Sequence, residues 1–176
     1  MINFRCLKTR LDLSKMRAEI ADSPAWIDIG RLPSAASTHA NSNRIQLRTN
    51  RRIAGLHYHE IQESESLPAW HALPETRRFV EDFAEATNGE IGRVRISKLD
   101  AGARIVPHVD VGGYCAIRDR YHLVIDAVLG TEFVVENEIV VMRENELWWF
   151  DNKKRHSVRN LGDQPRTHLI FDLLHT

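Results

Sequence analysis

The chain has 176 residues, and its 24 lysines and arginines equal its 24 aspartates and glutamates in number, so the formal net charge is zero. This length fits one domain, 1–176, with a buried core, and the balanced charge excludes binding of nucleic acid or a membrane by bulk electrostatics. No apolar run approaches the ~18 residues of a membrane span. Two cysteines form no disulfide framework and the N-terminus lacks a signal-peptide pattern, so we expect a cytoplasmic protein.

Residues 1–89 combine helical patterns with alternating segments. Apolar residues three or four positions apart predict a short helix within 11–24 and a longer one within 73–89. Alternation of apolar and polar residues predicts strands at 44–49 and 52–61. We expect this region to pack its helices and a few strands on the outside of a core formed by the rest of the chain.

Residues 90–176 have a different character, because short β-rich runs follow one another with turn signals and no helical pattern between them. Such a series predicts a mainly β fold in which two sheets form a sandwich or barrel, not a parallel sheet. The runs are 93–99, 104–110, 121–129, 132–137, 138–144, 146–152, 156–160 and 167–174.

Three residues of metal-ligand type occur in this β-rich part. His108 and Asp110 are two positions apart, so a strand points both side chains to one face. His156 starts a later run. Two imidazoles and one carboxylate can occupy one face of an octahedral ion and leave the other open, as in non-haem iron(II) oxygenases. The alternatives are an exposed strand edge for the first two residues and a loop histidine packed on tryptophan for His156.

Arg166 directly precedes the last β-rich run and starts the expected last strand, RTHLIFDLL. A guanidinium in a β-core costs free energy unless it meets an anion, and it binds a carboxylate through two parallel hydrogen bonds. An iron site beside an arginine suits 2-oxoglutarate, whose keto-acid end chelates the metal while its far carboxylate needs a cation. An ordinary salt bridge of Arg166 with Asp172 or Asp151 is the alternative.

Four segments in chain order resemble the aspartyl/asparaginyl β-hydroxylase family of iron(II)/2-oxoglutarate dioxygenases, which includes bacterial hydroxylases of free proline. They are RISKLDAGARIVPHVD, RYHLVID, ELWWFDNKKRHSVRN and RTHLIFDLL. The resemblance implies a double-stranded β-helix core over 90–176 that carries the metal site, with 1–89 as a support region. It also implies Fe(II), 2-oxoglutarate and O2 as cofactor and co-substrates, with His108, Asp110 and His156 as the iron ligands.

The resemblance implies roles for four further residues. Arg166 would bind the distal carboxylate of 2-oxoglutarate with Ser97 as a hydrogen-bonding helper, and Arg120 and His122 would lie near the keto-acid carboxylate or the substrate. Strand parity places Arg120 and His122 on one face. The alternatives are a plain strand serine at position 97 and a hydrogen-bonded core histidine at 122. Arg95 shares the face of Ser97; we interpret it as a solvated strand charge, with a substrate carboxylate as the alternative.

The predicted reaction is hydroxylation of an unactivated C–H bond of an amino acid, a peptidyl residue or a related small carboxylate, with release of succinate and CO2. The retained Asp110 favours hydroxylation over halogenation. The alternatives are a cupin-like metalloenzyme that does not use 2-oxoglutarate and a non-catalytic metal-binding sensor domain. We expect a small-molecule substrate as partner and neither nucleic acid nor membrane; the pattern defines no oligomeric state. The segment HYH at 57–59 has metal-like spacing without a third ligand, and we interpret it as an outer strand or a pocket wall.

Overall fold

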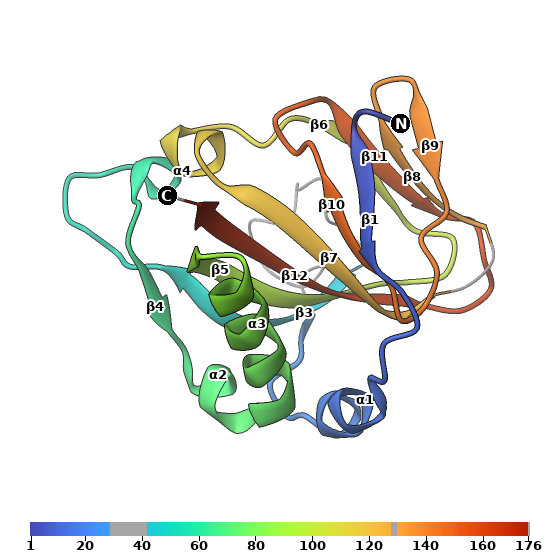
Figure 1. Cartoon of the computed structure of the whole chain (residues 1–176), viewed down its shortest axis with the longest axis horizontal. Helices are drawn as coiled ribbons and strands as arrows, with labels where there is room; N and C mark the ends of the chain where they lie inside the picture. Colours follow the sequence, from blue (N-terminus) through green and yellow to red (C-terminus); the bar gives the residue numbers. More distant parts are fainter. Residues whose placement is uncertain (29–41, 128–129, 176) are drawn as a thin grey trace.

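The computed structural model describes residues 1–28, 42–127 and 130–175 (Figure 1). The strands of the larger sheet are β1 Phe4–Lys8, β2 Ile27–Asp28, β3 Ser42–Asn50, β4 Ser64–Ser66, β5 Gly89–Leu99, β7 Asp119–Asp126, β10 Leu147–Phe150 and β12 Arg166–His175. Those of the smaller sheet are β6 Arg104–His108, β8 Thr131–Val135, β9 Glu138–Val140 and β11 His156–Asn160. The helices are α1 Ser14–Ala21, α2 Pro68–Ala72, α3 Pro74–Ala86, α4 Gly113–Ala116 and the 3-10 helix η2 Tyr58–Glu60.

The two sheets are antiparallel and lie face to face (Figure 1). The larger sheet has the order β1-β10-β7-β12-β5-β3-β2 with β4 on the side of β3, and the smaller has the order β6-β11-β8-β9. Each of the eight β-rich runs after residue 89 forms a strand, so the predicted mainly β class is confirmed. The last two residues of the run 121–129 lie outside the described residues.

The strand β7 shows how alternation separates two layers. Tyr121, Leu123 and Ile125 belong to the apolar cluster beneath the helices, whereas Val124 belongs to the cluster between the two sheets. Because successive side chains of a strand point to opposite faces, the large sheet has an outer face covered by helices. Its inner face is turned toward the smaller sheet, and the candidate site lies there.

The helices α1, α2 and α3 cover the outer face of the large sheet, as predicted for the N-terminal helices (Figure 1). Phe83 of α3 packs on Phe171 of β12 with ring centroids 5.7 Å apart. Glu19 of α1 accepts hydrogen bonds from the backbone N–H groups of Glu75 and Thr76, so α1 caps the first turn of α3. No described helix is long and apolar enough to cross a membrane.

The predicted strand over 52–61 is wrong. The chain there makes a turn and then η2, in which the backbone N–H of Glu60 donates to the carbonyl of His57. Leu56 and Tyr58 are 53% and 43% exposed, so the alternation of this segment does not mark a buried face. The side chain of Asn50 donates to the carbonyl of Tyr58, and such local bonds take the place of a strand ladder.

We expected the N-terminal strands to lie outside the core, and this is wrong: they extend the large sheet. β3 pairs with β5 along most of its length, and β1 pairs with β10 at the far edge. β1 was not predicted, because only Phe4 among its five residues is buried and the segment therefore has no alternation. Residues from the first part of the chain consequently reach the inner face of the sheet.

Candidate metal centre

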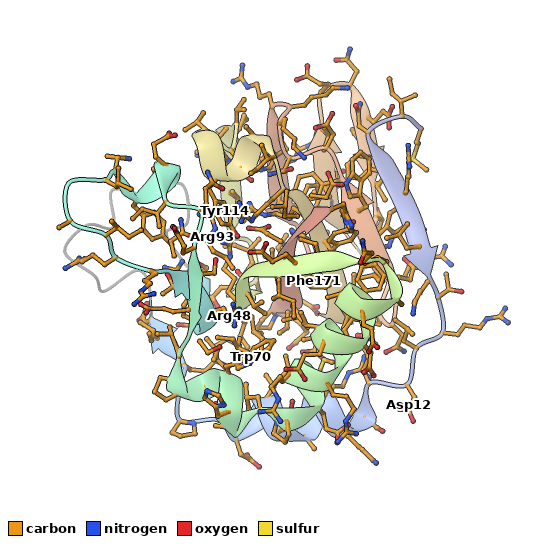
Figure 2. All side chains as sticks on the ribbon, turned by 60° about the vertical axis from the view of Figure 1, so that its left-hand side comes forward. Asp12, Arg48, Trp70, Arg93, Tyr114 and Phe171 are labelled. Atoms are coloured by element: carbon orange, nitrogen blue, oxygen red, sulfur yellow. The ribbon has the colours of Figure 1, made fainter. Side chains whose placement is uncertain are left out.

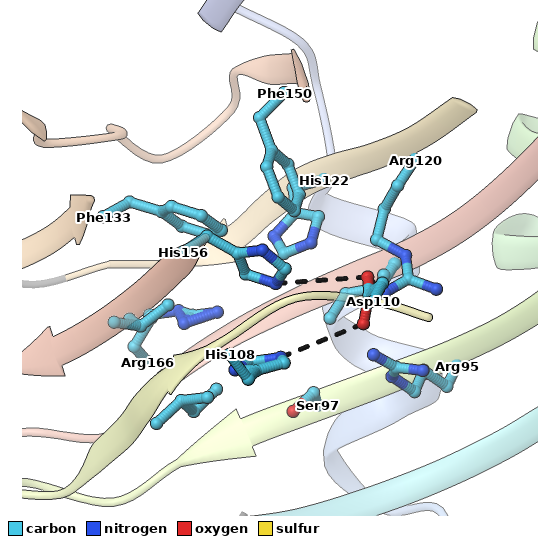
Figure 3. Close-up of a pocket in the computed structure, with 13 residues that line it drawn as sticks. Arg95, Ser97, His108, Asp110, Arg120, His122, Phe133, Phe150, His156 and Arg166 are labelled. Atoms are coloured by element: carbon cyan, nitrogen blue, oxygen red, sulfur yellow. Dashed lines mark hydrogen bonds and ion pairs between the residues drawn. The ribbon is translucent and has the colours of Figure 1, made fainter. Parts of the chain in front are cut away.

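His108, Asp110 and His156 converge at one end of the space between the sheets (Figure 3). β6 and β11 are antiparallel neighbours, and His108 at the end of β6 lies directly opposite His156 at the start of β11. Asp110 follows two residues beyond the end of β6 and not within the strand. The ligand-type atoms of the three residues all lie within 4.8 Å of one another. The sequence prediction that they come together is confirmed.

Both imidazole rings are oriented by backbone carbonyls. His108 Nδ1 lies 2.9 Å from the carbonyl oxygen of Val106, and His156 Nδ1 lies 2.9 Å from that of Lys154. A carbonyl only accepts hydrogen bonds, so each Nδ1 carries a proton, and the tautomer of the neutral ring is the one whose Nε2 has the lone pair. Burial lowers the pKa of His156 below its ordinary value, which favours the neutral, ligand-competent ring.

The Asp110 carboxylate is held in its ionised form by neighbouring cations. Burial raises its pKa, but the charges of Arg120, His156 and other cations outweigh burial, and the pKa lies well below its ordinary value. Arg120 donates to Oδ2 of Asp110, and Asn152 donates to the same oxygen at 3.4 Å. Oδ1 lies 3.9 Å from Nε2 of His108. Oδ2, which also accepts from Arg120 and Asn152, lies 4.0 Å from Nε2 of His156, so each carboxylate oxygen faces one histidine of the triad.

The carboxylate of Asp172 holds the guanidinium of Arg120 in place. The Nε and Nη2 atoms of Arg120 donate to the two oxygens of Asp172 at 2.7 and 3.0 Å, and Arg93 Nε lies 3.4 Å from the second oxygen. Asp172 is itself fully surrounded by protein, and the charge of Arg120 keeps its pKa low against the effect of burial. This chain of ion pairs connects a triad residue to the middle of β12.

Arg166 lies on the other side of the triad, in a small cavity of about 40 Å³ that the triad also lines (Figure 3). Its side chain is 1% exposed, and burial lowers its pKa to about 9. Within the described residues its Nε and Nη1 atoms have no hydrogen-bond partner. The alternative salt bridge is wrong: Asp172 pairs with Arg120 and Arg93, and Asp151 pairs with Lys154. A buried guanidinium with free donors costs free energy, so the site fits an added anion.

Ser97 and His122 line the same cavity from β5 and β7. Ser97 is half-buried and pairs in register with His168 of β12. His122 Nδ1 lies 3.1 Å from His168 Nδ1, so one ring donates and the other accepts. Burial lowers the pKa of both rings well below the ordinary value. His122 is therefore a hydrogen-bonded core histidine that also borders the cavity, and its role toward a ligand stays a prediction.

A second cavity, of about 380 Å³, adjoins the triad on the side of Asp110 and contains residues that the sequence did not single out as ligands. Tyr58 and His59 line it, which confirms the interpretation of this segment as a pocket wall. Arg95 lies between the two cavities, and it is not the solvated strand charge that we expected. Arg44 was missed, because its place in the site follows from the pairing of β3 with β5 and from no local pattern.

The fold and the paired sheets define a double-stranded β-helix, and solved structures agree. A 2OG-Fe(II) oxygenase family protein from Burkholderia pseudomallei is 16% identical with a TM-score of 0.69, covering 98% of this chain and 86% of its own. A prolyl hydroxylase from Trichoplax adhaerens, in complex with a hypoxia inducible factor peptide, is 11% identical with a TM-score of 0.61, covering 98% and 83%. At these identities the likeness shows the fold, which confirms the predicted double-stranded β-helix.

Residues 37–176 match the family model described as Aspartyl/Asparaginyl beta-hydroxylase. The chain belongs to this family, and the predicted resemblance is confirmed. A curated relative, L-proline cis-4-hydroxylase of Rhizobium meliloti (strain 1021), is 26% identical over 160 residues, which are 88% of this chain and 56% of the relative. The chain thus spans about half the length of that relative.

Proposed function

We propose that this chain is an iron(II)- and 2-oxoglutarate-dependent dioxygenase. It hydroxylates an unactivated C–H bond of an amino acid, a peptidyl residue or a related small carboxylate, and releases succinate and CO2. The observation that carries the proposal is one cavity that contains both the cluster of His108, Asp110 and His156 and the unpaired donors of Arg166. Membership of the family supports it, as does the proline hydroxylase named among the relatives.

Three protein ligands leave half of an octahedral coordination sphere open. In this proposal Nε2 of His108, Nε2 of His156 and a carboxylate oxygen of Asp110 hold the metal. The bound iron, with 2-oxoglutarate and O2, supplies the oxidising power needed to break the C–H bond. The protein positions the reactants and excludes water, and Phe133 and Phe150 form an apolar part of the cavity wall that serves this purpose.

Arg166 binds the distal carboxylate of 2-oxoglutarate in this proposal, and Ser97 adds a hydrogen bond from the neighbouring strand. A buried arginine–carboxylate pair satisfies donors that the protein alone leaves free. His122 borders the keto-acid end, and Arg120 acts there through its hold on Asp110. Residues 1–176 serve as one domain, in which 1–89 supports the core over 90–176.

The test is succinate formation by purified protein with iron(II), ascorbate, 2-oxoglutarate and air. Pools of amino acids and short peptides are added, and we expect one pool to stimulate succinate formation above the rate without substrate. His156→Ala is the matched control and should remove the activity. A rate equal to this control with every pool, together with no binding of 2-oxoglutarate to the manganese-loaded protein, would contradict the proposal. That result would instead support a metalloenzyme of another type or a metal-binding sensor.

A further inference from the structure

The larger cavity beside Asp110 has an excess of positive charge. Arg44, Arg93, Arg95 and Arg120 line it. Arg93 and Arg120 are neutralised by Asp172 and, for Arg120, also by Asp110. Neither the guanidinium of Arg44 nor that of Arg95 has an ion pair or hydrogen bond with any residue in the described ranges 1–28, 42–127 and 130–175. Two of the four arginines thus have no ion pair of their own among the described residues, although the charges of Asp110 and Asp172 act on Arg95 from further away. A divalent metal would add further positive charge.

Strand pairing places these two arginines side by side. Arg44 of β3 lies directly opposite Ser97 of β5, and Arg95 is two residues before Ser97. Diagonal positions of this kind on one sheet face are within reach of long side chains. Burial and the charges of Arg120, Arg93 and Arg44 together lower the pKa of Arg95 to about 10, against the opposing charge of Asp172. Like charges held together destabilise the protein unless an anion lies between them.

The wall of this cavity formed by η2 is tied to α4. The carboxylate of Glu60 accepts hydrogen bonds at 3.1 Å from the backbone N–H of Gly113. Gly112, with φ of +97°, approaches so closely that a Cβ there would lie 2.6 Å from Cβ of His59, so only glycine fits. Arg93 stacks on Tyr114 of α4 at 3.8 Å (Figure 2). The cavity therefore has an ordered wall, and its volume of about 380 Å³ lies in the range of small-ligand sites.

We propose that Arg44 and Arg95 bind a carboxylate of the substrate, and that the substrate is a small molecule with a free carboxylate, of the free amino-acid class, and not a residue within a peptide chain. This inference rests on the proposed function, because it places the substrate beside the triad. Arginine binds carboxylates through paired hydrogen bonds, and an anion between the two guanidinium groups removes their repulsion. Figure 3 shows Arg95 on the Asp110 side of the triad and Arg166 on the other, so substrate and co-substrate would have separate cations.

The test measures binding without turnover, in protein loaded with manganese and 2-oxoglutarate. The probes are the common free amino acids, the primary amide of each, and capped peptides that contain the same residues. We expect at least one free amino acid to bind, and its amide to bind at least about tenfold more weakly, because the amide lacks the charge. Equal binding of acid and amide, or binding of capped peptides alone, would overturn the proposal.

Substitutions of the two arginines test whether they bind the carboxylate of the amino acid. Arg95→Gln should raise the dissociation constant of that amino acid about 10- to 100-fold, the loss expected for a charge-assisted hydrogen bond, and Arg44→Gln should act in the same direction. Arg104→Gln, an exposed arginine of β6, is the matched control and should change nothing. The dissociation constant of 2-oxoglutarate should change less than about threefold in all three. If either cavity variant unfolds, the other carries the test. If a folded Arg95→Gln or Arg44→Gln protein binds the amino acid as tightly as the parent, that arginine does not bind the substrate carboxylate.

Failure of the proposed function gives a different pattern. In that case 2-oxoglutarate neither binds nor yields succinate, yet a free amino acid still binds in preference to its amide, and the carboxylate site stands without the dioxygenase. Succinate formation that only capped peptides stimulate gives the opposite pattern, in which the dioxygenase stands and the free-carboxylate site is wrong.

Discussion

The two faces of the large sheet are built by alternate residues of the same strands, and around the candidate site they contribute opposite terms to stability. On β5, Val94 and Ile96 are fully buried against the helices, while Arg95 and Ser97 on the inner face border the cavities. Burial of apolar surface stabilises by roughly 25 cal/mol per Å², whereas polar groups placed in the interior cost free energy until they find partners. The apolar packing beneath the helices therefore offsets the free-energy cost of the charged and polar groups on the inner face.

The largest effect is expected from breaking the inner face at the metal site. His108→Ala removes a proposed ligand from a half-buried position, so the fold should survive. We expect succinate formation to fall by more than the roughly 10- to 100-fold typical of residues that only support a metal ligand. Metal content after dialysis and the succinate rate measure this, with His71→Ala, an exposed histidine of α2, as the control. A variant that retained both metal and rate would remove His108 from the site.

The substitution Phe171→Ala tests the packing of the outer face. This ring is fully buried and packs against Phe79 and Phe83 of α3. Truncation of such a side chain should lower the free energy of unfolding by about 3–5 kcal/mol, which urea denaturation measures. Leu161→Ala, at an exposed position, should change it by less than about 0.5 kcal/mol. The affinity of the remaining folded protein for 2-oxoglutarate should be unchanged; a large loss of affinity would mean that the two faces are not separable.

The alternation that separates the faces is also what made much of the molecule predictable from sequence. The β-rich runs after residue 89 are bounded by turn residues, and the His-x-Asp pair and His156 fall in two of these runs. Arg166 could be predicted as a ligand-binding residue because a guanidinium in a β-core costs free energy unless it meets an anion. The strand predicted at 52–61 is wrong, since the apolar residues Leu56 and Tyr58 that alternate there are exposed and the segment forms a turn and η2.

The remaining parts of the site depend on register between strands distant in sequence. Arg44 meets the face of Arg95 only through the pairing of β3 with β5, about fifty residues along the chain. The link from Asp110 through Arg120 to Asp172 requires the pairing of β7 with β12. Local composition does not encode such register, because backbone hydrogen bonds do not distinguish one side chain from another and a shift by two positions preserves the faces.

Arg166 on the inner face has donors without a partner among the described residues, and this allows a prediction for both stability and ligand affinity. Arg166→Met keeps the length of the side chain but removes a buried charge, so the protein without ligands should be as stable as the parent or more so. The dissociation constant of 2-oxoglutarate should rise about 10- to 100-fold, and its thermal stabilisation of the protein should shrink accordingly. Calorimetry and thermal denaturation test both. Arg104→Met is the control. A destabilised variant with parental affinity would show that Arg166 has a partner within the protein.

The smallest effect is expected at Asp172, which lies on the inner face but does not contact the triad. It holds Arg120, and Arg120 holds Asp110, so Asp172→Asn should weaken this support while leaving every proposed ligand in place. We expect the metal dissociation constant to rise about tenfold, near the lower end of the range for supporting residues. Equilibrium dialysis with manganese measures it, and the amino-acid preference for acid over amide should persist.

The pH dependence of stability shows whether Asp172 acts through its charge or only through packing. The pKa of Asp172 is lower in the folded protein than its ordinary value of 3.8, so its ion pairs stabilise the fold above that pH, and the contribution is lost as pH falls through the folded pKa. The difference in unfolding free energy between the parent and Asp172→Asn should therefore be constant at neutral pH and narrow below pH about 4. A difference independent of pH down to the acid transition would mean that Asp172 contributes shape and not charge, and the metal affinity of the variant should then equal that of the parent.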